Sequence, residues 1–161
     1  MFRKTLGFAL VAACAGVALT ATGAAADVEI QRGNFSTVAL LRADGRVEDP
    51  LFRTWGFIRS HGQVENNRFR TIGYVRADGR VEEGRFRTIG FVRDDGEIED
   101  ASFRTVGYVR EGVILDAKFR AVGYYDPAGD DRDATRTVAA YLFFFSNLLF
   151  EQPGWEVVTG P

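Results

Sequence analysis

The stretch FRTIGYVRADGRVE, residues 69–82, decides the fold because variants of it recur along most of the chain. Its aromatic and β-branched residues favour a pleated, half-buried strand. Asp78-Gly79 between two such runs is typical of a tight hairpin, because the turn needs residues that tolerate a positive φ. The phenylalanines that open the copies lie 17 residues apart, with a last spacing of 16: Phe35, Phe52, Phe69, Phe86, Phe103 and Phe119.

The two ends of the repeat region complete each other. The last copy, FRAVGYYDPAG, stops before its second half, and that half occurs at the other end as Val28-Glu29-Ile30. Residues 27–126 therefore predict six two-stranded units, about 12 strands, in an antiparallel meander. A unit this short cannot bury its own apolar face, so neighbours must pack together. The split unit favours a closed sheet, because the first short strand can pair beside the last long one.

A helix is expected from about residue 133 to about residue 151. Pro127 breaks the strand pattern, and Asp130 and Asp131 supply an N-cap and negative charge. Residues 138–150 would span about 20 Å as a helix, short of the roughly 30 Å core of a bilayer. Because this segment is apolar on nearly every side, we expect it to be buried all round.

The strand number and the helix together predict the architecture. A barrel of about 12 strands has a radius near 9–12 Å and leaves a central space, which a helix about 10–12 Å across would fill. We therefore predict a mainly β fold, a closed antiparallel barrel or funnel plugged by one C-terminal hydrophobic helix. At least five of six side chains should then be buried: Phe143, Phe144, Phe145, Leu148, Leu149 and Phe150.

The repeated phrase GYVRADGRVE resembles the beta-flower repeat proteins of bacteria. The resemblance covers residues 28–126 and implies units that close into a symmetric, shallow barrel or funnel. Those families are commonly four- or fivefold, whereas this chain has six units. A barrel around a helix also resembles the tubby C-terminal domain, in architecture alone. Fold analogy does not transfer function, and the resemblance implies no catalytic residue.

Residues 1–26 have the pattern of a secretory signal peptide. Arg3 and Lys4 supply the positive n-region, residues 6–19 are almost wholly apolar or small, and Ala24-Ala25-Ala26 fits the small-x-small cleavage rule. We expect cleavage near Ala26, a mature N-terminus at Asp27, a periplasmic or extracellular location, and a single domain over residues 27–161.

Two alternatives remain for the same segment. The run Val11-Ala12-Ala13-Cys14 loosely matches a lipoprotein processing site, which would make Cys14 the lipidated N-terminus. Against it, the apolar stretch before Cys14 is brief and the residues after it stay apolar. An uncleaved anchor is the other alternative.

Composition argues against several classes of function. The mature chain would carry 18 basic and 22 acidic residues, net −4, so no nucleic-acid partner is expected. Cys14 is the only Cys and lies in the segment that we expect to be removed, and His61 is the only His. The mature chain would therefore have no thiol nucleophile, no Ser-His-acid set and no His cluster. We expect no enzyme, no cofactor and no metal. His61 takes the place of Asp in other turns and is interpreted as a turn residue. Acidic pairs such as Asp94-Asp95 lack a full loop of Ca²⁺ ligands.

Charged residues recur at fixed positions and would form rings in a closed barrel. The simplest interpretation is cross-strand charge pairing, worth about 0.2–1 kcal/mol per pair. A carboxylate series consists of Glu29, Glu48, Glu65, Glu82 and Glu99, and one arginine series of Arg42, Arg59, Arg76, Arg93 and Arg110. A functional interpretation assigns the other arginine series to an anion such as a phosphate or a lipid head group: Arg53, Arg70, Arg87, Arg104 and Arg120.

Two assignments of the inward face of the strands are consistent with the sequence. Strict alternation puts Gly73 and Val75 on one face and Ile72 and Tyr74 on the other, so both are partly apolar. Gly73 and the equivalent glycines mark either a bulge that turns the register or a place where the helix backbone comes close. Without a bulge, an outer belt would mark a membrane or partner surface: Trp55, Phe57, Ile72, Tyr74, Ile89, Phe91, Val106 and Tyr108.

Two functions are consistent with these patterns. The first is an exported, non-enzymatic module of the cell envelope that binds a protein partner, an envelope lipid or an assembly, with no ligand specified. The second is a membrane-anchored envelope component whose C-terminal helix leaves the barrel.

Overall fold

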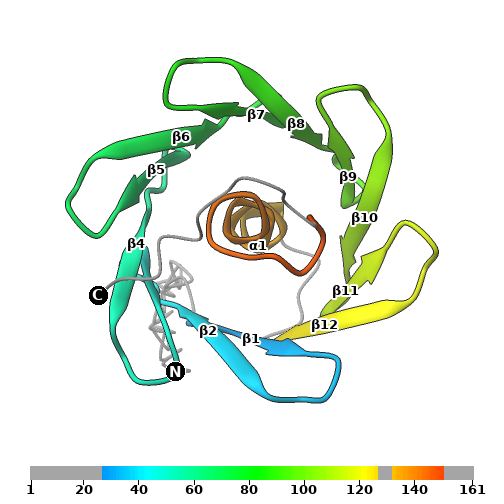
Figure 1. Ribbon diagram of the computed structural model, residues 1–161, viewed down its shortest axis with the longest axis horizontal. Helices are drawn as coiled ribbons and strands as arrows, with labels where there is room; N and C mark the ends of the chain where they lie inside the picture. The colour runs from blue at the N-terminus through cyan, green and yellow to red at the C-terminus, as the bar shows by residue number, and fades with distance from the viewer. Residues whose placement is uncertain (1–26, 127–131, 151–161) are drawn as a thin grey trace, which may run out of the picture.

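The computed structural model describes residues 27–126 and 132–150. Within them, twelve strands close into one antiparallel barrel around a single helix (Figure 1). This confirms the predicted fold class, including the helical plug. The strands are β1 (Val28–Arg32), β2 (Thr37–Leu41), β3 (Arg46–Glu48), β4 (Thr54–Ile58), β5 (Gln63–Asn66), β6 (Thr71–Val75), β7 (Arg80–Glu83), β8 (Thr88–Val92), β9 (Glu97–Asp100), β10 (Thr105–Arg110), β11 (Val113–Asp116) and β12 (Ala121–Asp126), and the helix is α1 (Arg132–Phe144).

The first short strand closes the barrel. Each strand pairs with its neighbours in the chain, and β1 pairs with both β2 and β12. Ile30 lies opposite Ala39 on one side and opposite Tyr125 on the other. The split unit at the two ends of the repeat is therefore completed in space, and the sheet has no free edge.

The two turns of a unit share one geometry, except that the turn at residues 110–113 is shorter and has both Glu111 and Gly112 at positive φ, 49° and 83°. In the first, the amide of Gly79 donates to the carbonyl of Arg76 at 3.0 Å, and Gly79 has a φ of +84°. In the second, the amide of Phe86 donates to the carbonyl of Glu83 at 2.8 Å, and Phe86 has a φ of +63°. The third residue of such a loop is left-handed and is usually glycine. Phenylalanine takes that position in all six units: Phe35, Phe52, Phe69, Phe86, Phe103 and Phe119.

A β-bulge in each long strand decides which side chains face the core. Between β5 and β6, Val64 pairs with Gly73 and Glu65 with Thr71, so Ile72 is the extra residue. Gly73 and Val75 are buried, and Ile72 packs against the core although strict alternation would place it outside. The bulge alternative is therefore confirmed. The outer belt expected without a bulge does not form, because four of its members turn towards the core: Trp55, Ile72, Ile89 and Val106.

The inward glycines form sockets for side chains of the plug. A Cβ built on Gly73 would lie 2.3 Å from the ring of Phe144 and 2.4 Å from the carbonyl oxygen of Glu82, closer than real Cβ atoms approach. The expected close approach is thus made by side chains at and beyond the end of α1. The pairs are Gly56 with Phe145, Gly73 with Phe144, Gly90 with Phe143, Gly107 with Leu149 and Gly123 with Leu148.

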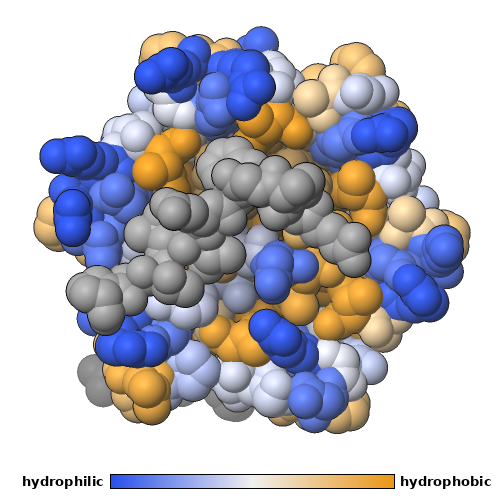
Figure 2. Space-filling model, viewed as in Figure 1, coloured by the Kyte–Doolittle hydropathy of each residue, from blue (hydrophilic) through white to orange (hydrophobic). Residues whose placement is uncertain are grey.

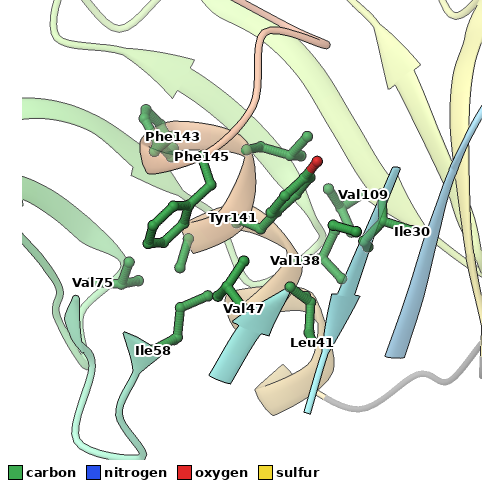
Figure 3. Packing of buried hydrophobic residues seen from close by; sticks show 14 of the residues in the cluster. Ile30, Leu41, Val47, Ile58, Val75, Val109, Val138, Tyr141, Phe143 and Phe145 are labelled. Carbon is green, nitrogen blue, oxygen red and sulfur yellow. The ribbon is translucent and has the colours of Figure 1, made fainter. Parts of the chain in front are cut away.

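The helix is shorter than predicted. Residues 138–143 are buried inside the barrel (Figure 3), but α1 ends at Phe144, and the expected end near residue 151 lies outside the described residues. Ser146 and Asn147 favour turns over helix, and Ser146 Oγ accepts from the amide of Leu148 at 3.0 Å.

The burial expected of the six plug side chains is wrong. Only Phe143 and Phe145 are buried. Phe144 ends the helix half-buried, and beyond it the chain leaves the helical path and spreads three more side chains half-buried against the core: Leu148, Leu149 and Phe150.

Candidate functional site

The barrel has two chemically different rims. The Phe-Arg rim consists of the turns at residues 32–36, 49–53, 66–70, 83–87, 100–104 and 116–120. The Asp-Gly rim consists of the turns at residues 42–46, 59–63, 76–80, 93–97 and 110–113. The helix begins at the Asp-Gly rim, where Arg136 bonds the carbonyl of Ala77. It ends at the Phe-Arg rim, where Phe143 and Arg87 line the same hollow.

The six phenylalanines of the Phe-Arg rim are exposed, by 62–67% of their surface. Five of them stack on an aromatic ring on the outside of a neighbouring long strand. Phe86, for example, lies 5.5 Å from Tyr74 between ring centroids, and the guanidinium of Arg76 lies 4.3 Å from the same tyrosine ring. Each phenylalanine thus connects two units while its other face meets solvent. The other stacked pairs are Phe35–Tyr124, Phe57–Phe69, Phe91–Phe103 and Tyr108–Phe119.

The arginines predicted to bind an anion follow these phenylalanines on the same rim. Four of the five pair with the acidic residue four positions earlier, at 2.5–2.9 Å, and are 65–79% exposed. Hydrogen bonds from Arg87 lower the pKa of Glu83. The four pairs are Arg53–Asp49, Arg87–Glu83, Arg104–Asp100 and Arg120–Asp116.

The acidic residue also shapes the turn, as Asp49 illustrates. Its side chain accepts hydrogen bonds from the amides of Leu51 and Arg53, both at 2.9 Å. Burial raises the pKa of the Asp49 carboxyl, but these bonds and the guanidinium of Arg53 outweigh burial and hold the pKa below its ordinary value.

Arg70 departs from the pattern. Asn66 stands where the other turns have a carboxylate, and it accepts from the amides of Arg68 and Arg70 at 3.0 and 3.1 Å. Among the described residues, Arg70 is therefore the member of the series with no carboxylate partner. Anion binding by this series stays a prediction.

Four members of the second arginine series pair with four members of the carboxylate series along the outer wall, whereas Glu29 accepts hydrogen bonds from Gln31 and Thr37. Arg76, for example, lies 2.7 Å from Glu82. Arg110 pairs with Asp95 at 2.9 Å, because Leu115 occupies the equivalent carboxylate position. The other pairs are Arg42–Glu48, Arg59–Glu65 and Arg93–Glu99.

His61 lies exposed on the Asp-Gly rim, with Nε2 3.0 Å from Oε1 of Gln63. In residues 27–126 and 132–150, no cluster of three or more His, Cys, Asp or Glu side chains is placed to hold a metal ion. Nor does this part of the chain contain a helix with the length and hydrophobicity to cross a bilayer. The export signals, including Cys14 and Ala26, lie outside the described residues.

The face at the Phe-Arg rim combines apolar and polar zones. Figure 2 looks onto the end of the barrel where α1 stops and shows apolar side chains around the centre and hydrophilic ones further out. The bulge residues of the six units are half-buried and pack against the core: Val38, Trp55, Ile72, Ile89, Val106 and Val122.

Sequence reasoning named the arginines of this rim but missed the exposed, left-handed phenylalanines beside them. The signal was present within each unit. When the two turns are aligned, Phe86-Arg87 falls where Gly79-Arg80 stands, so the phenylalanine occupies a glycine position.

Comparison with known proteins gives one match. The model of a family described as "5-fold beta-flower protein" matches residues 27–146. No curated protein and no solved structure matches the chain.

Proposed function

The chain belongs to the 5-fold beta-flower family, whose description names an architecture and no activity, and we propose that it acts as an exported, non-enzymatic binding module of the cell envelope. Its Phe-Arg rim binds the anionic head groups of an envelope lipid. The observation that carries this proposal is the exposure of a phenylalanine and an arginine side by side in five of the six turns. A phenylalanine ring inserts at the boundary between head groups and acyl chains, and arginine binds phosphate in a bidentate manner.

Charge is distributed unevenly along the barrel axis. The six turns of the Phe-Arg rim contain nine basic and four acidic side chains, net +5. Since the chain from residue 27 onwards carries −4, the remainder carries −9. An anionic surface would therefore attract the Phe-Arg rim, with about 1 kcal/mol for each basic residue that comes close. The turns of the Asp-Gly rim contain seven basic and six acidic side chains, net +1, so the positive charge is concentrated at the Phe-Arg rim.

The ion pairs on this rim are compatible with lipid binding. Exposed salt bridges contribute only about 0–1 kcal/mol each, so a lipid phosphate can replace the carboxylate partner of Arg104 or Arg120 at little cost. Arg70 has no such partner among the described residues.

The alternative of an anchoring helix has less support. Residues 138–143 are buried in the barrel, so α1 would have to leave it and empty the glycine sockets before entering a membrane.

Co-sedimentation with lipid vesicles tests the proposal. The chain from residue 27 should bind vesicles that contain phosphatidylglycerol, should bind pure phosphatidylcholine weakly, and should bind less at high salt. Replacing both Phe69 and Phe86 by glycine removes two rings without straining the turns, and should weaken binding at least about tenfold.

A matched pair of charge variants provides the control. Arg70→Gln on the Phe-Arg rim should weaken vesicle binding, whereas Arg80→Gln on the Asp-Gly rim makes the same change of net charge and should not. Equal effects of the two variants, or no binding by the unmodified chain, would contradict the proposal.

Export is tested separately by mass spectrometry of the protein expressed with residues 1–161. A mature chain that begins at Asp27 is expected. A lipid-modified Cys14 at the N-terminus would instead support the lipoprotein alternative.

A further inference from the structure

A cleft of about 720 Å³ opens at the Asp-Gly rim, between the first half of α1 and the turns of the first three units. Its size falls in the range of small-molecule sites. We propose that it binds a small amphipathic molecule with an aliphatic body and a carboxylate end.

The part of the cleft that lies inside the barrel is apolar. The barrel contributes Val28, Leu41, Ile58 and Val75, and Figure 3 shows the last three around the lower part of the helix. The helix turns small side chains towards this side, among them Ala134, Thr137 and Ala140, which leaves the space unfilled. Such a surface suits an unbranched aliphatic chain and offers it no hydrogen bond.

Arg136 is the residue that binds the carboxylate end of the proposed ligand. Its Nη2 donates to the carbonyl of Arg76 at 3.1 Å and to that of Ala77. No carboxylate of the described residues pairs with its guanidinium, whereas the other two arginines of the wall, Arg42 and Arg59, pair with Glu48 and Glu65.

The remaining polar groups of the wall are already arranged around the mouth. Asp44 pairs with Arg46 at 2.8 Å. Asp133 lies in the first turn of α1, and Ser60 and His61 also line the cleft. A carboxylate at Arg136 therefore adds a charge-assisted bond to a cation that is held in place by two carbonyl groups.

Titration with decanoate and with 1-decanol, followed by NMR, tests this assignment. Decanoate should bind saturably with one molecule per chain. Arg136→Gln should weaken decanoate about tenfold, as expected for the loss of a charge-assisted hydrogen bond, and should change 1-decanol binding less than about twofold, because only the carboxylate uses the charge.

Two threonines of α1 provide the steric test. Thr137→Leu places a larger side chain in the cleft and should weaken both ligands about tenfold through loss of space. Thr135→Leu, on the same helix but outside the cleft, should bind as the unmodified chain does. Thermal melts check that each variant is folded.

Three outcomes would overturn the proposal. They are the absence of saturable binding, equal losses for Thr135→Leu and Thr137→Leu, and equal losses of both ligands in Arg136→Gln. The double variant with Phe69 and Phe86 replaced by glycine should bind decanoate normally, which separates this cleft from the proposed lipid surface at the other rim.

Discussion

The left-handed phenylalanines show how a repeat can favour a costly backbone conformation. A positive φ costs a residue with a Cβ about 1–2 kcal/mol, and Phe86 has a φ of +63°. Stacking on Tyr74 offsets part of this cost, since a ring pair contributes about 0.5–1.5 kcal/mol beyond its buried area. The phenylalanine also covers the outer face of the tyrosine, so the turn joins neighbouring units.

Substitution of Phe86 separates the strain from the stacking. Phe86→Ala keeps the strain and loses the stack, so the free energy of unfolding should fall by about 1–2 kcal/mol. Phe86→Gly loses the stack but relieves the strain, and should be about 1 kcal/mol more stable than the alanine variant. Urea denaturation measures both, and an alanine variant as stable as the glycine variant would show that the turn is not strained.

The glycine sockets make a second prediction for single residues. In Gly73→Ala the new Cβ would meet the Phe144 ring at 2.3 Å and the Glu82 carbonyl oxygen at 2.4 Å, and the backbone atom cannot move without breaking the sheet. We expect a loss of about 3 kcal/mol or more in the free energy of unfolding. Gly33→Ala is the matched control, because its nearest neighbour is at an ordinary 3.5 Å. A socket variant as stable as the control would refute the tight fit.

Part of this residue chemistry could be predicted from the sequence. The Arg76–Glu82 type of pair follows from fixed spacing, because facing charges on adjacent strands pair. The inward turn of Ile72 could not, since a bulge shifts the register by one residue and reverses the face of every side chain beyond it.

The helix contributes six consecutive buried residues, 138–143, to the core, and its burial was predictable from its continuous hydrophobicity. Ser146 and Asn147 mark where the helix stops, but the apolar run continues at Leu148, which favoured a longer helix. The positions of the residues after Phe144 are set by the glycine sockets. Tyr141, one turn before the end of the helix, is 2% exposed. Burial raises the pKa of its phenol to about 12, although a hydrogen bond with Ser146 opposes the shift.

Tyr141 makes stability depend on pH in the alkaline range. Because the pKa is about 12 in the fold and about 10 in an unfolded chain, the folded state holds the proton more strongly. The stabilisation is complete below pH 10 and should be lost between about pH 10 and pH 12, by about 3 kcal/mol in total. Tyr141→Phe should flatten the curve of unfolding free energy against pH between about pH 10 and pH 12. An unchanged slope in this variant would show that other groups cause the pH dependence.

Phe144 tests the contribution of one plug side chain. It is half-buried and fills the socket at Gly73, so Phe144→Ala should cost about 2–3 kcal/mol, below the 3–5 kcal/mol typical of a fully buried phenylalanine. The expected result is a lower melting temperature with an unchanged β-sheet circular dichroism spectrum. A melting temperature equal to that of the parent chain would show that the contact between Phe144 and the socket at Gly73 does not stabilise the fold.

At the scale of the whole molecule, six units surround a plug that fits five sockets. The inward position of the first unit holds Ala39, which is fully buried, in place of glycine, and the other five units each receive one plug side chain. The count of six units and the closed barrel were predictable from the spacing of the repeats. The pairing of plug with ring was not, because it depends on the path of the chain after α1. That pairing makes the barrel and the plug one cooperative structure.

Removal of the plug is therefore predicted to abolish the fold. A chain ending at Asp133 leaves five sockets empty and exposes the inner face of a 12-stranded barrel too wide to be filled by its own side chains. The lost burial of several large side chains, about 3–5 kcal/mol for each one fully buried, exceeds the roughly 5–15 kcal/mol by which a domain is stable. Deletion of residues 134–161 should thus yield insoluble or unfolded protein, and a peptide of residues 132–161 added during refolding should restore the β-sheet spectrum. A soluble, β-rich chain that melts cooperatively without the peptide would show instead that the barrel closes on itself, and would leave α1 available for a membrane or a partner.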